Sequence, residues 1–285
     1  MTYLFLSIAI LAVTGQDIFK KKFNQKNTGG SFLFTAMLSA FAMLFFAAIN
    51  RDLDYNPILL IPSAAFALSF ATANFFAVQA IRCGSLAKTC LISSFSLLIP
   101  SGYGILFLGE PVSPSLIGGL LLLICSLILI NHEKGDVQKK TPAKWYLFAF
   151  LTFLGNGMCS TVQKAKQEIL GKQGDNLFMI VALATVTVIM LSISLCSKEE
   201  RTQTKEILRH GLLWAMLCGI ANGLTNYLVL LLNARLPASA LFPLLSSGHL
   251  ILAFLYSVFV VRERLTRRQC IGFWTGVASI VLLNL

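Results

Sequence analysis

The chain has 285 residues, of which 56% are apolar and only 12% are charged, and its mean hydropathy is +0.76. Soluble domains carry about 25% charged residues, so the composition excludes a soluble globular protein and predicts one embedded in a lipid bilayer. The net charge of +11 comes from lysines and arginines in short loops, where such residues orient membrane proteins. Basic and aromatic residues do not interleave as they do on RNA-binding surfaces, so the charge does not predict a nucleic-acid partner.

Ten apolar stretches follow one another along the chain, each near the length of about 20 residues that crosses the hydrocarbon of a bilayer. Two pairs of stretches are separated by almost no loop, at Arg82–Gly84 and Arg235–Pro237. Each pair is still divided, because a single helix of about 50 residues would extend about 75 Å, far more than a bilayer. The ten predicted spans are Tyr3–Phe19, Ser31–Ala48, Pro57–Ile81, Ser85–Leu108, Ser113–Ile130, Trp145–Val162, Leu177–Cys196, Gly211–Asn233, Pro237–Val261 and Gln269–Leu283.

The second half of the chain repeats the first half. The match has a shift of 153 positions, the interval from Arg82 to Arg235, and it continues without a gap to the end of each half. The segment Ser126–Asn131 (SLILIN) then falls on Ser279–Asn284 (SIVLLN). Other matching pairs are Ser93 with Ser246, Ser94 with Ser247, Tyr103 with Tyr256, Glu110 with Glu263, and Gly119 with Gly272.

The repeat divides the chain into two domains joined by a polar linker. The first five-helix domain covers residues 1–131, the linker covers 132–143, and the second five-helix domain covers 144–285. Because five is an odd number of spans, the second copy enters the membrane from the opposite side. The sequence therefore predicts an all-α membrane protein whose ten transmembrane helices form two inverted five-helix repeats. Such a plan offers two nearly equivalent conformations, one open to each side.

A short acidic turn follows the fourth span and recurs after the ninth. The turns are Leu108–Ser113 (LGEPVS) and Arg262–Thr266 (RERLT), at one register of the repeat. Together with the ten-helix plan over essentially the whole chain, they resemble the G-E-x-L-[ST] turns of EamA-type transporters in the drug/metabolite transporter superfamily. Pro111, Arg262 in place of Gly, and Thr14-Gly15-Gln16 in place of Trp-Gly depart from that pattern, so no subfamily's substrate is carried over.

The resemblance implies a secondary carrier in the bacterial cytoplasmic membrane, which moves small metabolites or drugs through a central cavity by alternating access. The sequence contains no GxxxxGK[ST] loop for nucleotide phosphates and no ligand cluster for a metal, so we expect no cofactor and no enzymatic activity. The seven cysteines lie mostly inside apolar spans without a CxxC pair, as small core residues do. A monomer suffices for such a carrier, and a proton, an ion or the substrate gradient would drive it.

Two other classes of membrane protein stay open. A lipid flippase or scramblase could use this fold, although a head-group site favours a basic pocket between helices. A membrane-embedded lipid-modifying enzyme would need clustered Asp, His or Cys residues, and the sequence does not gather them. The candidate lining described next suits amino acids, nucleosides, sugars or amphipathic drugs about equally.

The fourth and ninth spans carry matching polar faces. In the fourth span Ser93, Ser96 and Tyr103 are three and seven residues apart, with Pro100 between them, so they share one side of a helix. We expect these faces to line one central cavity and to bind the substrate. Small hydroxyl residues also let membrane helices approach closely, which is the alternative for the serines. The matching residues of the ninth span are Ser246, His249 and Tyr256.

Amide side chains form two further polar stripes. Asn222, Asn226 and Asn233 lie on one side of the eighth span, and Asn156 lies on one side of the sixth with Ser160 and Gln163. Amides in hydrocarbon must find partners or face water. Binding of a substrate in a cavity and hydrogen bonds between helices would both satisfy them.

Two ionisable residues inside spans are candidates for coupling. Asp17 can pair locally with Lys20 and Lys21, three and four positions on, or it can serve as a coupling or substrate group. His249 can change charge under ordinary conditions, so it is either a hydrogen-bonded structural residue or a proton relay. Since no unpaired carboxylate lies deep in a span, we expect passive exchange or coupling through another kind of group. The position of Glu110 at the end of a span predicts a capping or gating contact.

The basic residues also predict an orientation. The side that includes the loop after the first span carries 18 of the 23 lysines and arginines, among them those of a predicted solvated loop at Lys198–Arg201. The positive-inside rule then places both termini outside, whereas the family resemblance implies cytoplasmic termini, and we keep the charge count as our expectation. The basic residues of the other side are Arg51, Lys164, Lys166, Lys172 and Arg235.

Overall fold

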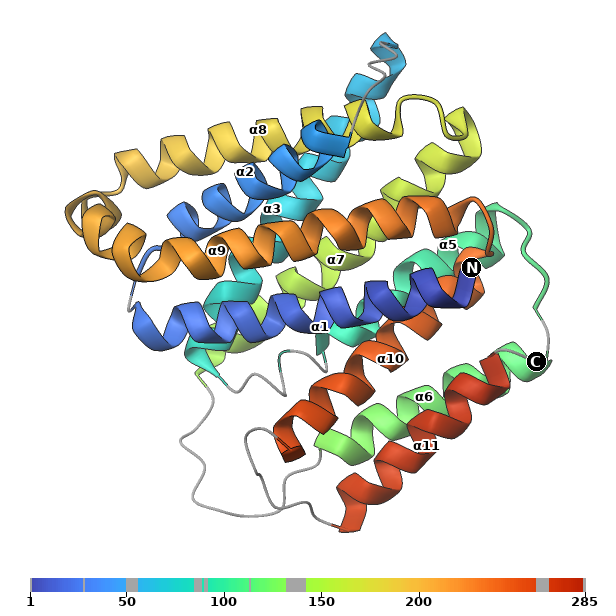
Figure 1. Ribbon diagram of the computed structural model, residues 1–285. Helices are drawn as coiled ribbons and strands as arrows, with labels where there is room; N and C mark the ends of the chain where they lie inside the picture. Colours follow the sequence, from blue (N-terminus) through green and yellow to red (C-terminus); the bar gives the residue numbers. More distant parts are fainter. Residues whose placement is uncertain are drawn as a thin grey trace.

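The computed structural model describes residues 2–27, 29–49, 56–84, 89, 92–112, 114–131, 142–259 and 267–283. In these ranges every regular element is a helix, which confirms the predicted all-α class (Figure 1). The elements are α1 (Thr2–Lys26), α2 (Ser31–Ile49), η1 (Pro57–Leu59), α3 (Leu60–Cys83), η2 (Phe95–Leu97), α5 (Leu98–Phe107), α6 (Pro114–Asn131), α7 (Ala143–Leu170), α8 (Asp175–Cys196), α9 (Lys198–Asn233), α10 (Ala238–Phe259) and α11 (Arg267–Leu283).

Five of the described helices are long and apolar enough to cross a membrane: Thr2–Lys26, Ser31–Ile49, Pro57–Cys83, Asp175–Cys196 and Lys198–Asn233. Their neighbours include shorter apolar helices, such as Ala238–Ala253. Large apolar side chains cover the outside of the bundle, for example Ile61, Leu68 and Leu106. An apolar outer surface of this extent is typical of a protein that is surrounded by lipid.

Helix α9 begins earlier than the sequence predicts. The predicted solvated loop Lys198–Arg201 is its first turn, and Glu200 within it is buried. Its carboxylate accepts hydrogen bonds from the backbone N–H groups of Phe32 and Leu33, both at 3.0 Å, and from Ser194 Oγ at 2.8 Å. Free N–H groups and the helix dipole favour a carboxylate at this place. The loop prediction was wrong because Glu200 caps α2, a partner that is distant in sequence.

Helices of the two halves alternate in the bundle rather than forming two separate groups. Helix α1 packs against α9, α3 packs against α7, and α2 packs against both α8 and α9. The largest apolar core lies among α2, α3, α8 and α9 and includes Phe34, Phe66 and Phe178. Glycines allow the closest approaches, as small residues do between membrane helices. A Cβ atom at Gly155 of α7 would lie 2.6 Å from the backbone nitrogen of Ala73 in α3.

Helices α6 and α11 form a pair with reciprocal hydrogen bonds (Figure 1). Ser126 Oγ of α6 donates to the carbonyl oxygen of Gly272 at 2.6 Å, and Ser279 Oγ of α11 donates to that of Gly119 at 2.8 Å. Both residues of the first bond correspond to those of the second at the shift of 153 positions. The same contact is therefore made twice with the helices exchanged, as in an interface with two-fold symmetry.

The fourth apolar stretch contains an irregular turn. The helix Ile92–Phe107 is interrupted by η2 before it continues as α5. Pro100 lies inside α5 and explains the position of the turn, because a proline ring displaces the carbonyl four residues earlier. That carbonyl belongs to Ser96, and it accepts instead from the N–H of Leu98. The interruption thus precedes Pro100, while Ser101 and Gly102 are helical.

Two glycine substitutions test this packing. We expect Gly155→Ala to lower the free energy of unfolding by about 1–3 kcal/mol, the usual cost of overpacking, because Ala73 backbone atoms cannot yield. Gly102 in α5 is the matched control, since no atom lies within 4 Å of a Cβ built there and alanine favours helices. Thermal unfolding in detergent compares the two variants. Equal stability of both variants would contradict the contact between α7 and α3.

Candidate functional site

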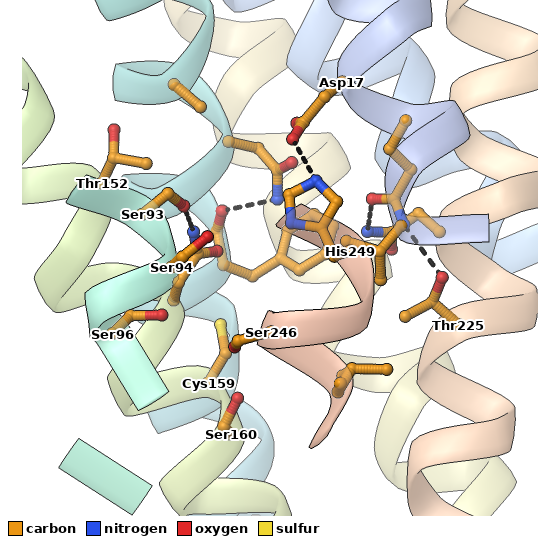
Figure 2. A pocket seen from close by; sticks show the side chains of 18 of the residues that line it. Asp17, Ser93, Ser94, Ser96, Thr152, Cys159, Ser160, Thr225, Ser246 and His249 are labelled. Carbon is orange, nitrogen blue, oxygen red and sulfur yellow. Dashed lines mark hydrogen bonds and ion pairs between the residues drawn. The ribbon is translucent and has the colours of Figure 1, made fainter. Parts of the chain in front are cut away.

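A cavity of about 170 Å³ lies at the centre of the bundle (Figure 2). Its walls come from α1, α3, α7, α9, α10 and the segment that precedes α5. Most of its lining side chains are polar, and Phe66, Phe70 and Phe242 add apolar patches. The described lining includes seven residues that the sequence predicts for substrate binding, and Asp17 as well. The seven are Ser93, Ser96, Asn156, Asn222, Asn226, Ser246 and His249.

Both predicted tyrosines lie elsewhere: Tyr103 and Tyr256 are not among the described residues that line the cavity. Tyr103 follows Ser96 by seven residues, about 10.5 Å along a helix, and its ring stacks on Phe107 with 5.5 Å between centroids. Leu97, just before α5, is the last residue of this stretch in the described lining. The shared helix face thus extends past the described lining, because helical periodicity gives the side of a helix but not the depth of a cavity.

The lining residues of the two halves correspond to one another. A shift of 143 positions carries the lining face of α1 onto that of α7, and the shift of 153 relates the segment before α5 to α10. The paired positions differ in their ionisable residues, because Asp17, Lys20 and His249 are each paired with a neutral residue. The ionisable side chains therefore lie on α1 and α10. The pairs are Val13 with Asn156, Gln16 with Cys159, Asp17 with Ser160, Lys20 with Gln163, Ser93 with Ser246 and Ser96 with His249.

Asp17 of α1 contacts two basic side chains in the cavity wall. His249 Nε2 of α10 lies 3.0 Å from Asp17 Oδ2, and Lys20 Nζ lies 3.7 Å from Asp17 Oδ1. Figure 2 shows the imidazole directed at the carboxylate. The local pair that the sequence predicts is therefore present, and the same carboxylate also reaches across to α10. Sequence reasoning missed Lys20 as a lining residue, because its spacing from Asp17 indicates only a local ion pair.

A chain of side-chain hydrogen bonds forms one wall of the cavity. Gln16 Nε2 donates to Thr225 Oγ1 at 2.9 Å, and Gln16 Oε1 accepts from Asn222 Nδ2 at 2.8 Å. Asn226 Nδ2 then donates to Asn222 Oδ1 at 2.8 Å, and Asn226 Oδ1 accepts from Gln163 Nε2 at 2.7 Å. The chain joins α1, α9 and α7. These amides therefore line the cavity and also bond to one another between helices.

The opposite wall presents hydroxyl groups. Asn156 Nδ2 donates to Ser93 Oγ at 2.6 Å. Ser96, Ser160 and Ser246 also line the cavity, and within the described residues their hydroxyls make no hydrogen bond. These three hydroxyls come from three different helical segments, so they can bond to a polar molecule in the cavity from several sides.

A buried ion cluster lies where α9 meets α10, away from the cavity lining. The Glu110 carboxylate accepts from the backbone N–H groups of Ala238 at 2.7 Å and Ser239 at 2.8 Å, and so caps α10. Lys164 Nζ lies 3.9 Å from Glu110 and donates to the carbonyl oxygen of Asn233 at 3.3 Å. The structure thus gives Glu110 the capping contact that its place at a span end predicts. Asn233 itself does not line the cavity.

Comparisons with known proteins identify the fold alone. No family model matches the chain, and no curated protein sequence matches it. A solved structure described as "Crystal structure of protein" is similar, with a TM-score of 0.75 over 99% of this chain and 95% of that chain. The sequence identity is 14%, so the likeness concerns the arrangement of the helices. Among the described residues, no group of three or more His, Cys, Asp or Glu side chains could hold a metal ion.

Mutations distinguish the hydrogen-bonded amides from the unbonded hydroxyls by their effect on stability. We expect Gln16→Leu to lower the free energy of unfolding by about 1–3 kcal/mol, because it removes the acceptor of the buried Asn222 Nδ2 and the donor to Thr225 Oγ1. Ser246→Ala is the matched control and should leave stability nearly unchanged. Thermal unfolding of both purified variants decides the matter. A loss of stability in the control of the same size as in Gln16→Leu would contradict the division into two walls.

Proposed function

We propose that this protein is a secondary transporter that moves a small metabolite or drug across a membrane by alternating access. The observation that carries the proposal is a polar cavity at the centre of an apolar bundle, because polar and ionisable side chains inside membrane proteins mark substrate and ion pathways. Both halves of the chain contribute walls to it. The proposed binding residues are the seven predicted ones in its lining, with Asp17 and His249 as candidates for coupling.

The helix contacts support a plan of two inverted repeats with ten spans. Exchanging the halves turns the contact of α1 with α9 into that of α7 with α3, and the contact of α1 with α10 into that of α7 with α5; all four contacts occur. The contact of α2 with α9 likewise turns into that of α8 with α3, which also occurs, and the contacts of α2 with α8 and of α6 with α11 join helices to their own counterparts. The reciprocal bonds of Ser126 and Ser279 agree with the same two-fold relation. Inverted repeats place the substrate site at their interface, and helices from both halves of the chain line this cavity.

Alternating access requires contacts that close one end of the path and break when that end opens. The cluster of Glu110 and Lys164 is suited to this role, because it joins the end of the fourth span to α7 and to the start of α10. Glu263, the counterpart of Glu110, lies outside the described residues. The proposal retains the resemblance to EamA-type transporters, which includes this acidic turn.

The alternative functions are weaker on the same observations. A lipid flippase would need a head-group site, which favours a basic pocket, whereas Lys20 is the one lysine or arginine among the described lining residues. A lipid-modifying enzyme would need a nucleophile with an activating group or a metal. Apart from Asp17, Lys20 and His249, the polar side chains of the described lining are mostly amides and hydroxyls, which suits the binding of a polar solute.

Transport by purified protein tests the proposal. Liposomes are loaded with an isotope-labelled metabolite extract, and the solutes that leave them are identified by mass spectrometry. We expect Asn156→Leu, which narrows the cavity and removes the partner of Ser93, to slow efflux about tenfold, equivalent to about 1.4 kcal/mol. Leu106→Ala, at an exposed outer position, should keep the unmodified rate. Movement of a labelled lipid without movement of any solute would favour a flippase.

A labelling experiment tests the predicted orientation. Lys172 lies in the turn before α8, and Lys198 is the first residue of α9, directly after α8, so they face opposite sides of the membrane under this proposal. Single cysteines at these two positions, in a cysteine-free background, are exposed to a membrane-impermeant maleimide on intact cells. The charge count predicts labelling at position 172 alone. Labelling at position 198 alone would place both termini in the cytoplasm.

A further inference from the structure

The charged residues of the cavity point to a substrate class. We infer that the substrate is a small hydrophilic monoanion, such as a short hydroxylated carboxylate, and that it crosses the membrane together with one proton held on His249. This inference rests on the proposed transport function and names the substrate of the same cavity. It follows from charge balance, from the side chains that face His249 and from the size of the cavity.

Charge balance is strict in a low-dielectric site, where an uncompensated charge is costly. With a neutral imidazole, the carboxylate of Asp17 and the ammonium of Lys20 balance one another in the empty cavity. A bound monoanion then adds one negative charge, and a proton on His249 cancels it. A bound monocation adds one positive charge, and the described lining has no second carboxylate to cancel it. The cavity therefore accepts an anion with a proton and rejects a cation.

His249 is the group that can change charge for this purpose. From α1 it is faced by Asp17 and Lys20, and α7 contributes the thiol of Cys159 to the same lining. The described lining residues of α3, α9 and the segment before α5 are amide, hydroxyl or apolar, and α10 adds no other ionisable group to the lining. A ring nitrogen of an imidazole can take up one proton and release it again. The proton enters on an imidazole nitrogen and leaves with the anion, so the transported pair carries no net charge.

Size and hydrogen bonding narrow the class further. The cavity of about 170 Å³ is smaller than the sites of about 300–1,000 Å³ that bury drug-sized ligands. Its lining also offers the unbonded hydroxyls of Ser96, Ser160 and Ser246, and the first two lie on segments other than the charged helices α1 and α10. A molecule that carries both a carboxylate and hydroxyl groups can bond to the charged side chains and to these hydroxyls.

Substitutions that change one charge at a time make distinct predictions. In His249→Gln no proton can balance the anion, so its uptake should fall at least tenfold. In Asp17→Asn the ammonium of Lys20 alone balances the anion, so uptake should continue but lose its dependence on a proton gradient. The double variant has the same balance as Asp17→Asn, so it should regain uptake without proton movement. Recovery in the double variant also shows that the loss in His249→Gln is not a failure to fold.

The experiment uses three probes of similar size in liposomes that contain the purified protein: glycerate as the anion, glyceramide as the neutral molecule and 3-amino-1,2-propanediol as the cation. Uptake is measured with isotope label, and internal pH with a trapped fluorescent dye. We expect glycerate uptake that rises as the external pH falls, that acidifies the interior in a one-to-one ratio, and that a membrane potential does not alter. Protein-free liposomes give the background from diffusion of the protonated acid.

Three results would overturn the inference: uptake of the cation in preference to glycerate, glycerate uptake driven by a membrane potential, or loss of all glycerate uptake in Asp17→Asn. Absence of glycerate uptake in the unmodified protein would also overturn it. Liposomes of the same preparation, loaded with the labelled metabolite extract, separate this failure from failure of the proposed function. If extract solutes still leave, only the substrate class is wrong, and if none leaves, the transport proposal falls as well.

Discussion

A polar group inside a bilayer has no water to bond with, and this constraint organises the whole bundle. Buried charged side chains take up the open ends of helices: Glu200 caps α2, Glu110 caps α10, and Lys166 donates to the carbonyls of Gly171 and Gln173 after α7. Each of these contacts satisfies backbone groups that a helix cannot satisfy itself. The polar side chains that remain are gathered around one central cavity.

The cavity combines a fixed wall with an adaptable one. On one side, amide side chains form hydrogen bonds to each other, so they hold three helices in register and keep the space open. These amides are Gln16, Asn222, Asn226 and Gln163. Within the described residues, the hydroxyls of Ser96, Ser160 and Ser246 make no hydrogen bond, so they can bond to a solute. A rigid frame with a few unsatisfied groups is the arrangement that gives a binding site its selectivity at low entropic cost.

The sequence predicts most of this architecture because its strongest signals are local. Each predicted stretch overlaps a described helix, and helical periodicity places Ser93, Ser96 and His249 on helix faces that line the cavity. The features that the sequence does not predict depend on contacts between segments that are far apart in the chain. Glu200 reads as a solvated charge until α2 is placed against it, and the bond of Gln16 to Thr225 joins residues 209 positions apart. Tyr103 shows a second limit of prediction from sequence, since it shares a helix face with Ser93 and Ser96 but is not among the described residues that line the cavity.

The interleaving of the two halves has a consequence for how such a bundle can move. Helix α1 belongs to the first half of the chain, yet the side-chain hydrogen bonds of Gln16 attach it to α9 of the second half, and α7 packs against α3 in the same crossed manner. Any motion of two rigid bodies in this bundle would therefore divide it into mixed sets of helices, and not into the first and second halves of the chain. Asp17 and His249 join α1 to α10, so a motion that separates these two helices would break the contact between their ionisable side chains.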